Sequence, residues 1–338
     1  MVKEWQAEEL QKISGAYWAG CVLQTGVELD IFTVLGNGPK DLPSLARELD
    51  CDQEALSMLV TALRAQELLD MSGDKVRAPE GVLRLLSRES PEYTGFIISH
   101  HAQIMKNWLR LPETVRKGRM VTRSETIFTE DEKTREDFLM GMFNVASLQA
   151  PSVASGLDFS GRARLMDIGG GPGAYAVYFC RQNPGLKADI FDLPGSGPTA
   201  RKCIARFGLE GRITFCPCNF KTDPLPGNYD VAWISQVIHG ENEKDAAALI
   251  AAAAACLNPG GLLCIQEFTL HDDRSGPAHA ALFALNMLVQ TPGGKAYTGR
   301  EIRDMLKAAG AVAVRDAGLK LPMDCRVFIG EMSNNTKK

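Results

Sequence analysis

The sequence predicts an α/β protein in which a helical N-terminal region precedes a doubly wound, mostly parallel seven-stranded sheet with an antiparallel edge strand. From about Arg162 onward, short apolar runs alternate with helical stretches, which is typical of a parallel sheet with helices on both faces. The last two apolar runs, 311–319 and 325–331, have no helix between them. We therefore expect them to form a hairpin that makes the pairing at one edge antiparallel.

The composition is that of an ordinary globular protein. The 338 residues are enough for two domains. Hydrophobic residues make up 45% and charged residues 23% of the chain, so a sizeable core can be buried. The net charge of −4 does not favour a nucleic-acid partner, because such proteins usually carry a basic face.

The cysteines and the apolar stretches point to an intracellular protein. The nine cysteines are an odd number, and we expect buried free thiols rather than a disulfide framework. Cys216 and Cys218 are the only close pair, and their spacing does not match a zinc site, so we expect no metal. The most apolar stretch, 246–257, has 12 residues, whereas a membrane span needs about 20. With no signal peptide evident, we expect a cytoplasmic protein without membrane contact.

Residues 1–90 have the pattern of a winged helix. Asp41 and Asp52 can each cap a helix, and a turn at Ser72-Gly73-Asp74 joins two short apolar strands. The helix expected at 53–65 carries a single arginine, whereas a DNA-reading helix needs several cations. We therefore expect this region to make protein–protein contacts.

The rest of the chain divides into a helical linker and the sheet domain. Residues 91–155 are expected to be helices that roof a pocket, with a polar loop around 118–131. Residues 156–338 should form the sheet. Its parallel strands are expected at 165–168, 188–191, 213–216, 230–234 and 262–265, with helices near 173–182, 197–207 and 243–256.

A glycine-rich turn follows the first strand of this domain. Asp167-Ile168-Gly169-Gly170-Gly171-Pro172-Gly173 opens a helix, and its glycines allow a tight turn with close approach of a ligand to the backbone. The third glycine of the dinucleotide fingerprint is missing, because Ala174 takes that position. Asp192 ends the second strand, where a carboxylate can accept both ribose hydroxyls.

Together these signals resemble the class I S-adenosylmethionine-dependent methyltransferases. The chain from about 15 to 332 is similar to the small-molecule O-methyltransferases, the branch with plant phenolic, acetylserotonin and bacterial tailoring enzymes. The matching stretches are 167–173, Phe191-Asp192-Leu193-Pro194, Asn219-Phe220, Val237-Ile238-His239, Leu257-Asn258-Pro259-Gly260-Gly261, Gln266-Glu267 and Thr291-Pro292-Gly293-Gly294-Lys295. The resemblance implies a homodimer built by the N-terminal domain and a small-molecule substrate, without a nucleic-acid or membrane partner.

The resemblance also implies a cofactor site for S-adenosylmethionine, which leaves as S-adenosylhomocysteine. Gly169, Gly171 and Gly173 line its methionine end, Asp192 holds its ribose, and Asn219 and Phe220 flank its adenine. The family usually has aspartate where Asn219 stands, and asparagine still offers an acceptor to the adenine amine. Asp167, Leu193 and Ser235 complete the predicted set.

His239 and Glu267 are the predicted catalytic residues. His239 matches the family's general base, which takes the proton of the acceptor hydroxyl as the methyl group arrives. Glu267 ends the fifth strand, where its carboxylate could orient the imidazole ring. The family often has acidic residues where this chain has Gly240 and Ala296, so the acid that supports the base is partly missing.

The acceptor pocket is predicted from the resemblance alone. Its candidate residues are Trp108, Phe143, Asn144, Trp233, Phe283, Asn286 and Met287, which together suit an aromatic ring. The leading hypothesis is O-methylation of a small aromatic hydroxyl compound. The alternatives are a carbon methyltransferase of the same fold, a scaffold that binds the cofactor without catalysis and, more distantly, a nicotinamide-dependent oxidoreductase.

Overall fold

The computed structural model describes residues 3–121 and 131–334. The chain divides into two compact units, Met1–Met105 and Lys106–Lys338. Residues 122–130 of the loop predicted around 118–131 lie outside the described residues. No helix in the described ranges is both long and apolar enough to cross a membrane.

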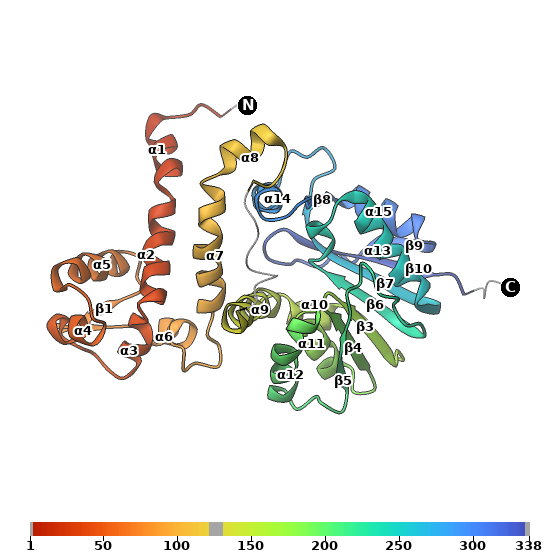
Figure 1. Ribbon diagram of the computed structural model, residues 1–338, viewed down its shortest axis with the longest axis horizontal. Helices are drawn as coiled ribbons and strands as arrows, with labels where there is room; N and C mark the ends of the chain where they lie inside the picture. Colours follow the sequence, from red (N-terminus) through yellow and green to blue (C-terminus); the bar gives the residue numbers. More distant parts are fainter. Residues whose placement is uncertain (1–2, 122–130, 335–338) are drawn as a thin grey trace. The chain divides into compact units, whose positions relative to one another are not determined.

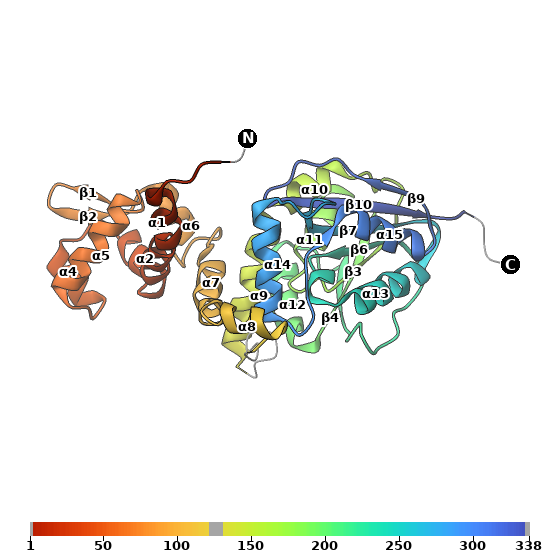
Figure 2. The ribbon, with the colours of Figure 1, turned by 90° about the horizontal axis from the view of Figure 1, so that it is seen from above.

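The first unit is helical with one hairpin. Its elements are α1 (Ala7–Gly15), α2 (Tyr17–Glu28), α3 (Ile31–Gly36), α4 (Leu42–Glu48), α5 (Gln53–Ala65), β1 (Asp70–Ser72), β2 (Lys75–Arg77), α6 (Glu80–Leu86) and the start of α7 (Gly95–Trp108). The predicted caps are confirmed, because Asp41 accepts from the Ser44 amide and Asp52 from the Ala55 amide, each at 2.8 Å. Figure 2 shows the hairpin β1–β2 beside α5, and Val76 shares one apolar core with the α5 side chains.

The second unit contains the sheet and the helices around it. After α7 the helices are α8 (Leu111–Lys117), α9 (Glu132–Ser147), α10 (Ala150–Gly156), α11 (Ala174–Gln182), α12 (Gly197–Arg206), α13 (Glu243–Ala255), α14 (Ala278–Gln290) and α15 (Gly299–Ala308), with short 3-10 turns η1 (Pro194–Ser196) and η2 (Ile238–Gly240). The strands are β3 (Arg164–Ile168), β4 (Lys187–Asp192), β5 (Ile213–Pro217), β6 (Tyr229–Ser235), β7 (Leu257–Leu270), β8 (Tyr297–Thr298), β9 (Ala311–Asp316) and β10 (Cys325–Met332).

The strand order is β5-β4-β3-β6-β7-β10-β9, and the short β8 pairs with the end of β7. The pairs from β5 to β7 are parallel, whereas β10 pairs antiparallel with both β7 and β9. The antiparallel pairing at one edge is therefore confirmed. The reversed strand is β10, and β9 lies outside it as the edge strand.

Helices cover both faces of this sheet (Figure 1). Helices α9 to α12 pack with the strands in one apolar core, and α13 and α15 contribute to the other. The alanine-rich stretch forms α13 and buries one face, which includes Ala246, Ile250 and Ala253. The two layers leave the carboxyl ends of the parallel strands free to carry a site, as expected for a doubly wound sheet.

Candidate active site

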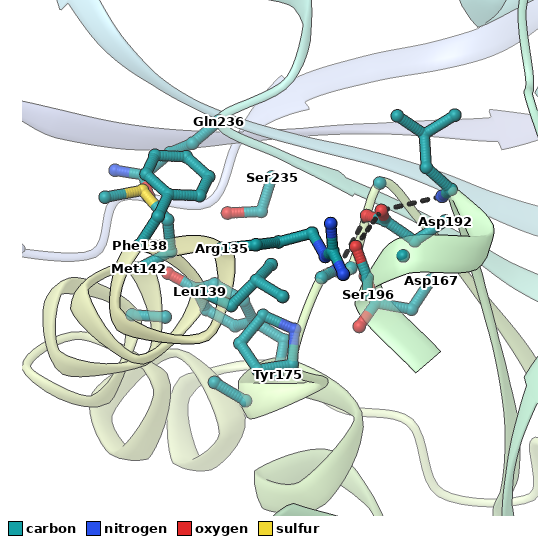
Figure 3. Close-up of a pocket in the computed structure, with 18 of the residues that line it drawn as sticks. Arg135, Phe138, Leu139, Met142, Asp167, Tyr175, Asp192, Ser196, Ser235 and Gln236 are labelled. Atoms are coloured by element: carbon teal, nitrogen blue, oxygen red, sulfur yellow. Dashed lines mark hydrogen bonds between the residues drawn. The ribbon is translucent and has the colours of Figure 1, made fainter. Parts of the chain in front are cut away.

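A cavity of about 430 Å³ lies at the carboxyl ends of β3, β4 and β6. This volume is within the range of small-molecule sites, roughly 300–1,000 Å³. In Figure 3, Asp192 and Ser196 lie at one end of the cavity and Phe138, Met142 and Gln236 at the other, with Ser235 between them. The lining residues come from α9, the glycine turn, the Asp192 turn and the segment after β6: Arg135, Phe138, Leu139, Met142, Ala146, Asp167, Gly169, Gly170, Gly171, Pro172, Ala174, Tyr175, Asp192, Leu193, Gly195, Ser196, Ser235, Gln236 and His239.

The glycine turn depends on backbone conformations that side chains disfavour. Gly173 has a φ of +83°, and a Cβ there would overlap Cδ1 of Ile190 on β4. Gly171 has a φ of +52°, and its amide donates to Oδ2 of Asp192 at 2.8 Å. Since only glycine adopts these conformations readily, the turn can bring its backbone close to both a ligand and the Asp192 carboxylate.

Two carboxylates face this cavity, the half-buried Asp192 and the buried Asp167. Asp192 Oδ1 accepts from the Leu193 amide and from the Ser196 hydroxyl, each at 2.7 Å, and burial raises the pKa of this carboxyl. Asp167 is 1% exposed, and its Oδ2 has no hydrogen-bond partner among the residues that the structure describes. Burial raises the pKa of Asp167 to about 7. An orphaned buried carboxylate beside a ligand cavity favours a cationic or hydrogen-bond-donating ligand, because such a ligand would restore the lost solvation.

His239, which lines the cavity, forms a hydrogen-bonded pair with Glu267. Nδ1 of His239 lies 2.8 Å from Oε2 of Glu267, and the Glu267 side chain is fully buried. A carboxylate can only accept a hydrogen bond, so the neutral imidazole carries its proton on Nδ1 and keeps a lone pair on Nε2. Phe283 packs its ring edge-to-face with the imidazole, with 4.8 Å between ring centres.

The segment from Thr291 to Lys295 holds the backbone of His239. The Lys295 amide donates to the His239 carbonyl at 2.9 Å, and the Gly294 amide donates to the Thr291 hydroxyl at 2.8 Å. A Cβ at Gly294 would overlap the His239 carbonyl oxygen. A glycine at this position therefore lets the segment approach the backbone of His239 closely.

Most of the predicted cofactor residues meet at one place. Asp167, Gly169, Gly171, Asp192, Leu193 and Ser235 all line the cavity, and so does His239, which was predicted as catalytic. Gly173 lies beneath the turn, against Ile190. Asn219 and Phe220 are outside the cavity lining. Asn219 Oδ1 accepts from the Lys221 amide at 3.2 Å, so its side chain caps its own turn, and Phe220 packs against the core.

The predicted acceptor-pocket residues are scattered, and two of them need correction. Trp233 and Phe143 are core residues, because Trp233 packs between Tyr175 and Phe179 and Phe143 lies in the same apolar cluster. The remaining five are also outside the cavity lining. Trp108 Nε1 donates to Asn286 Oδ1 at 2.9 Å, Met287 is buried, Phe283 touches the His239 ring, and Asn144 follows Phe143 on α9.

The sequence reasoning missed the contribution of α9 and of Gln236. Arg135, Phe138, Leu139, Met142 and Ala146 all line the cavity from α9. Their spacing of three or four residues places them on one helix face. That spacing was available in the sequence, but it does not say which element the face covers. The described residues hold no group of three or more His, Cys, Asp or Glu placed to bind a metal ion.

Comparisons with known proteins agree with this geometry. The sequence model of the O-methyltransferase domain matches residues 108–311. The chain is 33% identical to 3-hydroxy-5-methyl-1-naphthoate 3-O-methyltransferase of Streptomyces sahachiroi, over 93% of this chain and 92% of that one. It is 30% identical to the tetracenomycin polyketide synthesis 8-O-methyl transferase of Streptomyces glaucescens, over 93% and 94%.

A solved structure extends the comparison to the fold. Human N-acetylserotonin methyltransferase in complex with S-adenosylmethionine aligns with a TM-score of 0.87 and 26% identity, covering 98% of this chain and 99% of that one. The family match spans more than half of this chain, and the relatives cover nearly all of it. The chain therefore belongs to the O-methyltransferase domain family.

Proposed function

We propose that this protein uses S-adenosylmethionine to methylate a hydroxyl group of a small aromatic molecule, with His239 as the general base. The observation that carries the proposal is the pair of His239 and the fully buried Glu267, 2.8 Å apart, beside the same cavity as Asp167 and Asp192. One cavity thus combines a proton acceptor with two carboxylates that suit a cationic nucleoside.

The residues present fit the cofactor. When bound, it supplies a methyl group on a positively charged sulfonium. The unpartnered Oδ2 of Asp167 offers an acceptor to its cationic portion, and Asp192 offers its carboxylate to the ribose hydroxyls. The amides of the glycine turn are close enough to Asp192 to fix its orientation, since Gly171 donates to it at 2.8 Å.

The base works through its free ring nitrogen. Nε2 of His239 accepts the proton of a bound hydroxyl as the oxygen becomes a nucleophile. Glu267 accepts the hydrogen bond from Nδ1–H and stabilises the imidazolium formed by that transfer. Because Glu267 is fully buried, no water competes for this hydrogen bond.

The apolar wall of the cavity supports an aromatic acceptor. Phe138, Leu139 and Met142 present one face of α9 to the cavity, and Phe283 contacts the imidazole from another side. Flat aromatic rings bury most area against such side chains. These contacts support an aromatic substrate class.

Replacement of His239 by alanine tests the proposal. We expect kcat for a phenol to fall about 10²- to 10⁴-fold, while S-adenosylhomocysteine binds with unchanged affinity by calorimetry. A variant that methylates phenols at the wild-type rate would refute the base assignment. A carbon methyltransferase would lose less activity, and a non-catalytic scaffold would transfer no methyl group in either form.

The N-terminal unit is proposed to form a homodimer through a winged-helix-like domain of residues 1–90, with 91–155 as linker and 156–338 as the cofactor domain. Helices α1 and α2 expose large apolar side chains: Leu10, Ile13, Tyr17 and Trp18, each more than half exposed. Exposed patches of this kind often mark protein interfaces. Sedimentation at micromolar concentration should give a dimer, and monomers alone would contradict it. A cytoplasmic location stays a prediction.

A further inference from the structure

The cavity has a polar end that the proposed chemistry does not use. Gln236 lies there with Phe138 and Met142 in Figure 3, away from Asp192. Its Nε2 donates to Sγ of Cys325 at 3.7 Å, which is a weak hydrogen bond to a poor acceptor. Among the described residues, none donates to the Gln236 side-chain oxygen.

The backbone of Gln236 is held in an unfavourable conformation. Its φ is +55°, a region that a residue with a side chain adopts only at a cost in free energy. The Gln236 amide donates to the Gln266 carbonyl at 2.9 Å, which fixes the chain directly after β6. Strain of this kind persists where the surroundings impose it, and it is common at ligand sites.

A buried layer of amides supports this end of the cavity. Gln266 donates from Nε2 to Oε1 of Gln149, and both side chains are fully buried. Ser235, which lines the cavity, donates to Oε1 of Gln266 at 3.5 Å. The three glutamines lie beside the Cys325 thiol, whose pKa burial raises to about 12. The layer is therefore neutral at physiological pH.

The charges around the cavity disfavour an anionic acceptor. Asp167 and Asp192 line it, and Glu267 lies directly behind His239. Arg135 is the single cation among the described lining residues, and its side chain packs against Gly195 at the Asp192 end. A carboxylate placed at the His239 end would meet acidic and neutral groups without a partner, which is costly in a partly buried site.

We propose that Gln236 is a specificity-determining residue whose amide binds a neutral hydrogen-bonding substituent, such as a carboxamide or a carbonyl, on the acceptor ring. The amide offers both a donor and an acceptor, and a carboxamide matches both. A carboxylate is disfavoured because its negative charge would share the cavity with Asp192, with Glu267 behind His239, and would have no cationic partner at this end among the described lining residues. This inference rests on the proposed function, because it assumes that an aromatic acceptor occupies this end of the cavity.

Three probes of equal ring size test the inference: 3-hydroxy-2-naphthamide, 3-hydroxy-2-naphthoate and 2-naphthol. Their dissociation constants are measured by naphthol fluorescence with S-adenosylhomocysteine present, and methyl transfer is measured separately. The wild type should bind the amide about 10-fold more tightly than either other probe, since a buried polar group left unpaired weakens binding by about that factor.

Gln236→Met keeps the length of the side chain and removes its polar atoms. It should bind the amide about 10-fold more weakly and 2-naphthol within about twofold of the wild type. Gln182→Met is the matched control, because Gln182 is exposed at the end of α11 and does not line the cavity; it should leave the amide preference unchanged. Gln236→Asn tolerates the positive φ better and shortens the amide, so it should fold and still lose the preference.

An unchanged ratio of amide to naphthol affinity in both Gln236 variants would overturn the role of Gln236. So would tighter binding of the carboxylate than of the amide by the wild type. Binding with the expected preference but without methyl transfer would overturn the proposed function and keep the recognition role. Failure of all three probes to bind would count against the aromatic acceptor, and with it against this inference.

Discussion

Replacement of Glu267 by glutamine tests how the base is positioned. The side chain is fully buried, and Oε2 lies 2.8 Å from Nδ1 of His239. Glutamine has the same shape, and its single oxygen can take the place of Oε2, which lies beside His239 Nδ1 and 3.3 Å from the Phe268 amide. The hydrogen bond from the His239 amide to Oε1, at 3.2 Å, is then lost. The substitution therefore removes the charge while the fold is retained.

The expected loss follows from the hydrogen bond that changes. A hydrogen bond to a charged group contributes about 1.5–3 kcal/mol and a neutral one about 0.5–1.5 kcal/mol. The charge difference acts on the imidazolium formed in the transition state, so the barrier should rise by about 1–2 kcal/mol. This corresponds to a fall in kcat of about 5- to 30-fold, with little change in the affinity for S-adenosylhomocysteine.

A double-mutant cycle with His239→Ala is the decisive assay. If Glu267 acts only through the imidazole, Glu267→Gln should change the residual rate of the His239→Ala enzyme by less than about twofold. Equal losses in both backgrounds would refute the positioning role. Glu241→Gln is the matched control, because Glu241 pairs with Lys221 outside the cavity lining and should leave kcat unchanged.

Three further substitutions test the cofactor half of the cavity. Asp192→Ala should raise the dissociation constant of S-adenosylhomocysteine about 10- to 100-fold by calorimetry. Asp189 is on the same strand as Asp192 and pairs with Arg164 of β3, so Asp189→Ala is the control and should not change this affinity; equal affinities of the two variants would exclude the ribose contact. Gly173→Ala should lower the free energy of unfolding in urea by clearly more than Gly161→Ala, because both glycines have positive φ but only Gly173 faces a clash; matched losses would contradict the packing. Burial raises the pKa of Asp167 from 3.8 to about 7, so the folded state binds the proton more tightly than the unfolded state. The stability that this group contributes is therefore full below about pH 4 and is lost as the pH rises through 7. Asp167→Asn should flatten this fall of the unfolding free energy with pH, measured by urea titration, and an unchanged pH dependence would show that the carboxyl is already ionised.

The sequence predicted the fold, and it placed several of the proposed cofactor residues at what the structure shows to be one cavity, because both signals are local. Turns with required glycines, an acid at the end of a strand and alternating apolar runs depend on residues that are neighbours in the chain. Asp167, Gly171 and Asp192 were found in this way. Glu267, the partner of the proposed base, could also be predicted, since the carboxyl ends of adjacent parallel strands meet at one edge of the sheet.

The acceptor end was harder to predict because its lining depends on tertiary packing. In a central parallel strand both faces are buried, and Trp233 and Ile234 are both fully buried. The sequence pattern therefore does not distinguish an aromatic residue that faces the core from one that faces a pocket. The periodic face of α9 was visible, but only packing decides that Phe138 and Met142 face a cavity while Phe143 faces the core.

Of the two departures from the family pattern, at Gly240 and Ala296, the one at Ala296 has a physical explanation in this structure. Ala296 is buried in an apolar cluster with Phe268 and Leu270, where an acid would add a second anion close to Glu267. One carboxylate at 2.8 Å already neutralises one imidazolium, and a further buried charge without a partner would be destabilising. Among the described residues, Glu267 is then the acid that hydrogen-bonds the His239 ring, while Lys295 holds the His239 backbone and Phe283 packs against the ring. A base with a single supporting acid should be more sensitive to loss of that acid than one with two, so a loss near the upper end of the expected range is the outcome that this geometry favours for Glu267→Gln.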